Sequence, residues 1–426
     1  MNSRRYRVGW PRALLAAVLV VSLAARAALI GEPCRSPCRT AADHVLVFDE
    51  VYYVAAARVI DGLPPRVDQR YGSAPAGTDP NSEHPQLVKL AMAGLIRLLG
   101  DGPWAWRLPS LLTGTLAILG LWALVRAAGG SEAEASVAAA LLAADNLILV
   151  HGRIGTLDMP ALAAMLWAVA LALRRRWAAG AVVLALGAGA KEVALLAVAI
   201  IALIELGRAG WRSRRGWAQV AGFAVASVAV WLITVELMDA VAPPWDPLRH
   251  RSVGGGALGH VAHMLGYGAS QRSAHGQAGI TSGPWLWPID LKPIVYLNVN
   301  PRQPAAGLEG VHPAVHFLGM MSPPVLLAGL AGMGLGLARP RSGGTGLRRA
   351  AWAWLVATYL PFLGASLVLG RTSYLYYMVV VMPGLAMLGA GWLVVLASSH
   401  RRMALGYGGL VLLAAVALYP FTPVPG

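Results

Sequence analysis

The sequence has few charged residues. Of its 426 residues, 13% are Asp, Glu, Lys or Arg, roughly half the share that is usual in soluble domains. Lysine occurs at three positions only, Lys89, Lys191 and Lys292, whereas hydrophobic residues make up 57% of the chain. The surface of a soluble protein of this length needs more charge, so the composition excludes an ordinary soluble protein and predicts a chain that crosses a membrane many times.

The apolar residues are gathered in eleven runs that are separated by short polar connections. The runs occupy residues 13–30, 108–125, 133–150, 159–173, 177–190, 193–207, 217–238, 318–338, 351–369, 375–397 and 403–419. Runs of this length predict membrane-spanning helices, so we expect an all-α polytopic protein that forms a single domain over residues 1–426.

The net charge of +15 comes from basic residues that lie in short clusters between the apolar runs. They form no continuous stripe, which argues against a nucleic-acid partner. The clusters at residues 126, 174–176, 208–215, 339–349 and 401–402 all fall on the same side as the arginine-rich amino terminus. The positive-inside rule then predicts a multi-pass protein of the cell membrane with a cytoplasmic amino terminus and an extracytoplasmic carboxyl terminus.

Two long loops, residues 31–107 and 239–317, fall on the extracytoplasmic side. Within the first loop, apolar residues recur at helical spacing from Asp49 to Asp61 and from His84 to Leu99, which predicts two helices lying in the membrane interface. Cys34 and Cys38 are also in this loop, where a disulfide can persist. A disulfide and two unpaired thiols are both consistent with the sequence.

The acidic pair Asp49–Glu50 opens the first interfacial helix. Neighbouring residues on a helix point about 100° apart, so both carboxylates cannot face one reacting atom. One carboxylate could act on a substrate while the other holds the loop. The alternative is that Asp49 is only a helix N-cap.

Several cations lie at the predicted outer ends of the spans, where burying a charge is costly and usually serves a function. They are Arg107, Arg153, Lys191 and Arg371; Asp158 and Tyr376 lie close to them in the sequence. Four cations on one face suit an anion such as a phosphate. For any one of them, an ion pair inside the protein is an equally good interpretation.

The segment from Asp79 to Pro85 gathers carboxylates and His84, which invites a metal-site hypothesis. Its spacing is not that of a known metal site. We therefore expect neither a metal nor another cofactor, and we assign the segment to loop structure or substrate contact.

Taken together, these motifs resemble the protein O-mannosyltransferases and the wider GT-C superfamily of glycosyltransferases that use phospholipid-linked sugars. The resemblance is carried by residues 48–53, 84–90, 106–110, 153–158, Lys191 and 284–288. It implies a GT-C fold of about eleven spans. It also implies that Asp49 is the general base, with Glu50 beside it, and that Arg107, Arg153 and Asp158 lie near the pocket for the lipid phosphate. Gln86 and Glu192 depart from the family pattern, where a proline and an aromatic residue are usual.

The resemblance implies an inverting transfer of a sugar, mannose in the first instance, from a polyprenyl-phosphate carrier to a Ser or Thr hydroxyl of an exported protein. In this interpretation Arg107, Arg153, Lys191 and Arg371 bind the donor phosphate. His84, Lys89, Asp158 and Tyr376 support the site, and Tyr267, Trp285, Trp287 and Tyr296 are available to stack on a sugar or a peptide. The alternatives are a GT-C enzyme that modifies a lipid or an envelope glycan, and a transporter of lipid-linked substrates.

Overall fold

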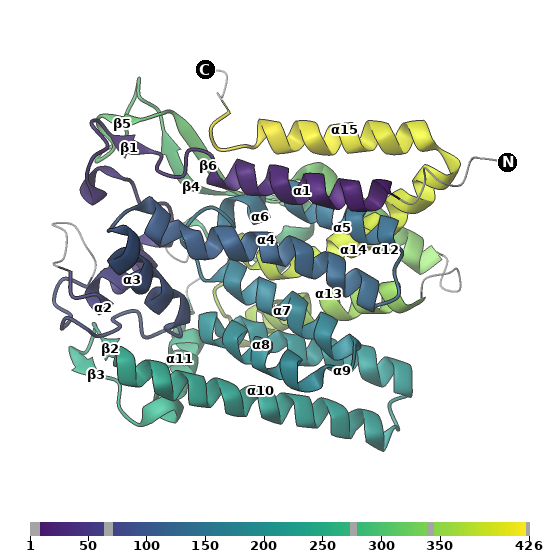
Figure 1. The fold of residues 1–426 in the computed structure, drawn as a ribbon, viewed down its shortest axis with the longest axis horizontal. Coiled ribbons are helices and arrows are strands. Elements are labelled where there is room, and N and C mark those ends of the chain that lie inside the picture. The colour runs from purple at the N-terminus through teal and green to yellow at the C-terminus, as the bar shows by residue number, and fades with distance from the viewer. Residues whose placement is uncertain (1–8, 64–70, 273–278, 339–344, 423–426) are drawn as a thin grey trace.

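A computed structural model describes residues 9–63, 71–272, 279–338 and 345–422 of the protein. The long helices run side by side in one bundle, and the long loops gather at one end of it (Figure 1). The helices of the bundle are α1 (Trp10–Ala27), α4 (Pro103–Ala127), α5 (Glu132–Ala144), α6 (Asn146–His151), α7 (Asp158–Leu173), α8 (Trp177–Ala190), α9 (Leu196–Ala209), α10 (Arg214–Val241), α12 (Pro323–Ala338), α13 (Thr345–Leu369), α14 (Met378–Ser399) and α15 (Arg401–Ala417). The predicted helical membrane fold is thus confirmed.

Each of the eleven apolar runs coincides with at least one helix of this bundle. The third run is divided between α5 and α6 at Asp145, whose carboxylate accepts hydrogen bonds from the backbone N–H groups of Ile148 and Ser322. Five helices in the described ranges are long and apolar enough to cross a membrane by themselves: α1, α4, α10, α13 and α14. The others are shorter, so the count of eleven crossings stays a prediction.

Small residues allow the central helices to approach one another closely. A Cβ atom added to Gly120 of α4 would lie 3.1 Å from the Cβ atom of Leu166 on α7, and one added to Gly187 of α8 would lie 2.5 Å from the Cβ of Ala164. Close packing of this kind is typical of helices in a membrane, where the hydrophobic effect does not drive helices together. Gly120 and Gly187 therefore allow these central helices to pack closely.

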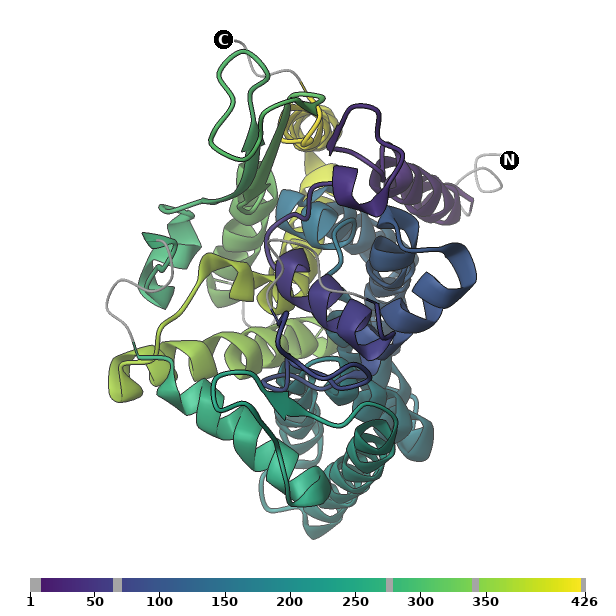
Figure 2. The same ribbon diagram turned by 90° about the vertical axis from the view of Figure 1, so that its left-hand side faces the viewer.

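The loop end of the bundle carries the two predicted interfacial helices and one that was not predicted. The first two are α2 (Glu50–Ile60) and α3 (Leu87–Leu99), and the third is α11 (Gly256–Ser270) in the second loop. Short 3-10 turns lie at Ala41–Asp43, Glu192–Leu195, Pro284–Ile289 and Leu375–Tyr377. The helices α2 and α3 face the viewer in Figure 2, where they cover the end of the bundle.

Three two-stranded antiparallel sheets add to the all-helical expectation, and all of them lie in the loops. The strands are β1 (Cys34–Arg35) with β5 (Val311–His312), β2 (Trp245–Asp246) with β3 (Arg251–Ser252), and β4 (Ile294–Val299) with β6 (Val315–Gly319). The β1–β5 pair joins the first long loop to the second. The two loops therefore form one structure at the loop end of the bundle.

Helices α1 and α15 place the two ends of the described chain at opposite ends of the bundle. Helix α1 begins at the end opposite the long loops, whereas α15 ends on the loop side (Figure 1). An odd number of crossings produces this arrangement. Which end of the bundle faces the cytoplasm stays a prediction.

We expect a reporter that is active only in the cytoplasm to be silent when it is fused after Gly426. The same reporter fused after Gly210, in the basic connection between α9 and α10, should be active, because positively charged connections stay inside. Reporter activity in living cells measures both. A strong signal from the fusion at Gly426 would mean that the number of crossings is even.

Candidate active site

Asp49 lies at the position just before α2, at the loop end of the bundle. Its backbone carbonyl accepts hydrogen bonds from Tyr52 and Tyr53, but its side chain makes no capping hydrogen bond to the helix. The N-cap alternative therefore does not account for the carboxylate. The surrounding protein desolvates this group and raises its pKa to about 6, and the positive charge of Lys191 acts in the opposite direction.

Asp158 and Lys191 form a buried ion pair near Asp49. Nζ of Lys191 lies 2.7 Å from Oδ1 of Asp158, and both side chains are more than 90% buried. Nζ also lies 5.6 Å from the centre of the Tyr376 ring. The sequence predicted that Lys191, Asp158 and Tyr376 belong to one site. The fold brings them together: Asp158 begins α7, Lys191 follows α8, and Tyr376 lies in the 3-10 turn just before α14.

His151 and Tyr296 complete this centre, and the sequence analysis did not single out His151. Nδ1 of His151 lies 3.4 Å from Oδ2 of Asp158, and its Nε2 lies 2.8 Å from the hydroxyl of Tyr296. The Tyr296 ring stacks on Phe48, the residue before Asp49, at a distance of 4.0 Å. His151 lies two residues before Arg153, where the motif of residues 153–158 begins. Its position next to this motif could have identified His151 as a site residue.

Glu50 is turned away from Asp49 and holds the loop. Its carboxylate accepts hydrogen bonds from the backbone N–H groups of Val47 and Gly155 and from Nε and Nη2 of Arg107. The side chain is fully buried. Of the two roles that the sequence left open for the acidic pair, Glu50 takes the structural one.

The assignment of Arg107 to the donor phosphate does not fit this geometry. Besides Glu50, its guanidinium donates to the backbone carbonyls of Ile30, Glu32 and Val45. These five hydrogen bonds engage all of its N–H groups. Arg107 is a structural residue that ties the first loop to α4.

Arg153 also differs from the prediction. Its guanidinium is buried and donates to the carbonyls of Ala25, Ala28 and Leu29 at the end of α1 and to the hydroxyl of Tyr419. It also lies 4.6 Å from the centre of the Phe421 ring. Arg153 therefore joins the two ends of the chain inside the protein, where the sequence analysis expected a phosphate ligand.

Arg371 remains available to a ligand. Its side chain is partly exposed, its Nε donates to the carbonyl of Gly268, and its guanidinium carbon lies 5.9 Å from the Tyr377 ring centre. Lys191 lies near the ring of the neighbouring Tyr376. Two of the four predicted cations, Lys191 and Arg371, thus lie beside adjacent tyrosines.

The supporting residues His84 and Lys89 organise the loop beside the centre. Nδ1 of His84 lies 3.3 Å from Oε2 of Glu192. Nζ of Lys89 is buried and donates to Asp79 and to the carbonyls of Asn81 and His84. Because Lys89 already binds the Asp79 carboxylate, this group is not available as a metal ligand. The contact argues against a metal site in this segment.

Two of the aromatic residues proposed for stacking are not available. Trp287 is fully buried and donates to the hydroxyl of Ser282, and Tyr296 is buried against Phe48 and His151. Trp285 is 56% exposed. Burial of Trp287 and Tyr296 leaves Trp285 and the partly exposed Tyr267 as candidates for contact with a substrate.

Comparison with known proteins agrees with this geometry. Residues 83–233 match the model of the dolichyl-phosphate-mannose-protein mannosyltransferase family. No curated protein matches the chain.

Three solved structures resemble the whole chain. The S. cerevisiae protein O-mannosyltransferase Pmt1-Pmt2 complex bound to the sugar donor is 12% identical with a TM-score of 0.66, and the match covers 96% of this chain and 89% of that one. ArnT from Cupriavidus metallidurans is 19% identical (TM-score 0.54; 93% and 62% covered). The oligosaccharyltransferase from Archaeoglobus fulgidus is 15% identical (TM-score 0.54; 98% and 55% covered). At these identities the likeness shows the fold, and the chain spans less than two thirds of the last two proteins.

The fold and the family match together define the class of protein. The chain has the fold of these three membrane glycosyltransferases, which transfer lipid-linked sugars, along nearly its whole length. The stretch that matches the mannosyltransferase family model, residues 83–233, contains Arg107, Arg153, Asp158 and Lys191.

We expect Glu50→Gln to destabilise the protein strongly, because it leaves the buried charge of Arg107 without its counter-ion. Breaking a buried pair of this kind costs about 3–5 kcal/mol. Thermal unfolding in detergent measures the change. Glu132→Gln is the matched control, since Glu132 pairs with the exposed Arg12, and it should leave the unfolding temperature almost unchanged. An equal effect of the two variants would contradict the structural role of Glu50.

Proposed function

We propose that the protein transfers mannose from a polyprenyl-phosphate carrier to a Ser or Thr hydroxyl of an exported protein, on the extracytoplasmic side of the membrane. The observation that carries the proposal is the Asp49 carboxylate, which the helix cap leaves free, next to the Lys191–Asp158 pair. The family match supports the choice of mannose. The similar S. cerevisiae protein O-mannosyltransferase complex, which is bound to the sugar donor, supports the kind of donor.

Asp49 is the general base in this mechanism. The acceptor hydroxyl gives its proton to Asp49 while its oxygen attacks the anomeric carbon of the sugar. The bond from that carbon to the phosphate oxygen breaks, and its electron pair leaves with the phosphate. A single displacement of this kind inverts the anomeric configuration.

Lys191 and Arg371 are the cations that we assign to the donor phosphate. They lie beside the adjacent rings of Tyr376 and Tyr377, and Lys191 also acts electrostatically on Asp49. The departing phosphate monoester has a second pKa of about 6, so it leaves without a proton donor, and fixed positive charge stabilises it as it forms. Asp158 orients Lys191, and His151 contacts Asp158 from the other side.

We expect Asp49→Asn to lower kcat by about two to four orders of magnitude, because the amide keeps the shape and loses the base. Sugar transfer from a polyprenyl-phosphate donor in detergent measures kcat. The matched control is Asp61→Asn, the same change at the other end of α2, where Asp61 pairs with Arg97. The control should stay within a few-fold of the unchanged protein. Activity of Asp49→Asn in that same range would remove Asp49 from the mechanism.

The pH dependence of kcat/KM should report the same carboxylate. Below its pKa of about 6, Asp49 holds a proton and cannot accept another, so kcat/KM should fall about tenfold for each pH unit. Above this pKa the rate should reach a plateau. Initial rates across the acid limb, with enzyme stability checked at each pH, measure the profile. A profile without this acid limb would contradict Asp49 as the base.

The acceptor is tested by profiling secreted proteins and envelope lipids of a null strain by mass spectrometry. The proposal expects hexose to disappear from Ser and Thr residues of exported peptides, and to return when the intact gene is restored. The gene carrying Asp49→Asn should not restore it. An unaltered set of glycopeptides alongside a missing glycolipid would assign the enzyme to lipid modification instead.

A further inference from the structure

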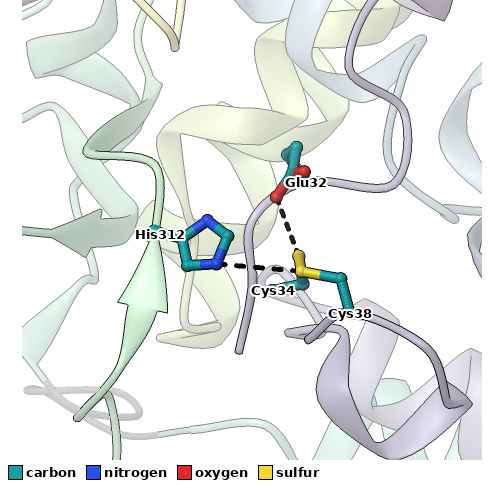
Figure 3. A group of neighbouring side chains, drawn as sticks. All are labelled: Glu32, Cys34, Cys38 and His312. Atoms are coloured by element: carbon teal, nitrogen blue, oxygen red, sulfur yellow. Dashed lines mark hydrogen bonds between the residues drawn. A yellow bond between two sulfur atoms is a disulfide. The ribbon is translucent and has the colours of Figure 1, made fainter. Parts of the chain in front are cut away.

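A second cluster of reactive side chains lies in the two long loops. It consists of Glu32, Cys34 and Cys38 of the first loop and His312 of the second (Figure 3). One donor atom from each residue lies within 4.8 Å of the other three. In the part of the chain that the structure describes, this is the group of side chains whose geometry suits a metal ion.

The fold brings these four residues together from distant parts of the sequence. Strand β1 pairs with β5 in a register that places Cys34 opposite His312. The tight turn after β1 returns the chain at Cys38, which has a φ of 54°, so that Cys38 forms a disulfide with Cys34. Of the two states that the sequence left open for these cysteines, the structure has the disulfide.

The disulfide does not satisfy the polar groups around it. Oε2 of Glu32 lies 3.0 Å from Sγ of Cys34, yet a disulfide sulfur carries no hydrogen to donate. Among the described residues the structure gives this oxygen no other hydrogen-bond partner. Nε2 of His312 lies 3.9 Å from Sγ of Cys38. A carboxylate oxygen and an imidazole nitrogen thus each lie beside one of the two disulfide sulfurs. Four ligand atoms gathered in this way are typical of a metal site.

We propose that reduction of the Cys34–Cys38 disulfide creates a Zn²⁺ site made of the two thiolates, the His312 imidazole and the Glu32 carboxylate. A dithiol reductant supplies two electrons and two protons. The S–S bond breaks, two thiols form, and the reductant is oxidised to its own disulfide. Binding of Zn²⁺ then releases the two thiol protons.

The ligand set and its spacing both suit zinc. Zn²⁺ binds sulfur at about 2.3 Å and nitrogen or oxygen at about 2.0–2.2 Å. Ligand atoms at the corners of such a tetrahedron are roughly 3.3–3.8 Å apart. The four donor atoms are already within 4.8 Å of one another, so small side-chain movements suffice once the sulfurs separate. Thiolate and imidazole ligands do not suit Mg²⁺ or Ca²⁺.

Zinc would link different parts of the protein than the disulfide does. The disulfide joins two residues four positions apart in the first loop, whereas a metal bound by His312 would join the first loop to the second. The carbonyl of Glu32 also accepts a hydrogen bond from Arg107, which pairs with Glu50 beside Asp49. One hydrogen bond therefore connects the backbone of this cluster to the ion pair beside Asp49.

The full-length protein in detergent is reduced with a phosphine under anaerobic conditions, freed of reductant and dialysed against Zn²⁺. Metal content per chain is then measured by mass spectrometry. We expect the reduced protein to retain about one equivalent and the oxidised protein to retain none above background. Co²⁺ in place of Zn²⁺ should give the absorption of tetrahedral thiolate coordination.

His312→Ala removes one ligand without touching the cysteines and should weaken zinc binding by at least about tenfold. His316→Ala is the matched control, because His316 lies four residues further along, on β6 and outside the cluster. Zinc should also raise the unfolding temperature of the reduced unchanged protein more than that of His312→Ala.

Two results would overturn the proposal. One is a reduced protein that binds no more zinc than a variant with both Cys34→Ser and Cys38→Ser. The other is equal affinity of His312→Ala, His316→Ala and the unchanged protein, which would mean that the thiols bind metal without the second loop. Neither result tests sugar transfer, so either of them would leave the proposed glycosyltransferase activity unaffected.

Discussion

The buried ion pair between Glu50 and Arg107 is the interaction on which the loop end of the protein depends. Glu50 accepts hydrogen bonds from Arg107, Val47 and Gly155, and so joins the first loop, α4 and the segment before α7. A buried charge is tolerated only when its partner and the remaining hydrogen bonds are in place. Because Glu50 is committed to this role, its neighbour Asp49 is free to face the centre formed by Asp158, Lys191 and His151.

The helices of the bundle could be predicted from the sequence, because an apolar run of sufficient length has few other stable structures in a membrane. The helical spacing of the first loop likewise predicted α2 and α3. The small sheets could not be predicted in the same way. Cys34 and His312 pair in β1–β5 although about two thirds of the chain separates them in sequence, and no local pattern specifies a partner so distant.

The site was predicted in part, and the errors have a common physical cause. A cation at the end of an apolar run needs an anion or several carbonyls, but the sequence does not say whether the protein or a ligand provides them. For Arg107 the partner is Glu50, 57 residues away, and for Arg153 it is a set of carbonyls on α1 and a tyrosine after α15. Lys191 and Asp158 were each expected at the site from motifs of the resembled family, but the ion pair between them was not predicted.

The contacts of Arg153 have a consequence for how the protein is made. Its guanidinium donates to the backbone carbonyl of Ala28, just after α1, and to the hydroxyl of Tyr419. The hydroxyl of Tyr419 in turn donates to the carbonyl of Ala25. Synthesis proceeds at about 5–20 residues per second, so α1 leaves the ribosome many seconds before Tyr419 does. During that interval Arg153 lacks the hydroxyl of Tyr419 as a partner. The contact between Arg153 and Tyr419 therefore forms only after α15 has inserted, and until then α1 must be kept in place by the helices beside it.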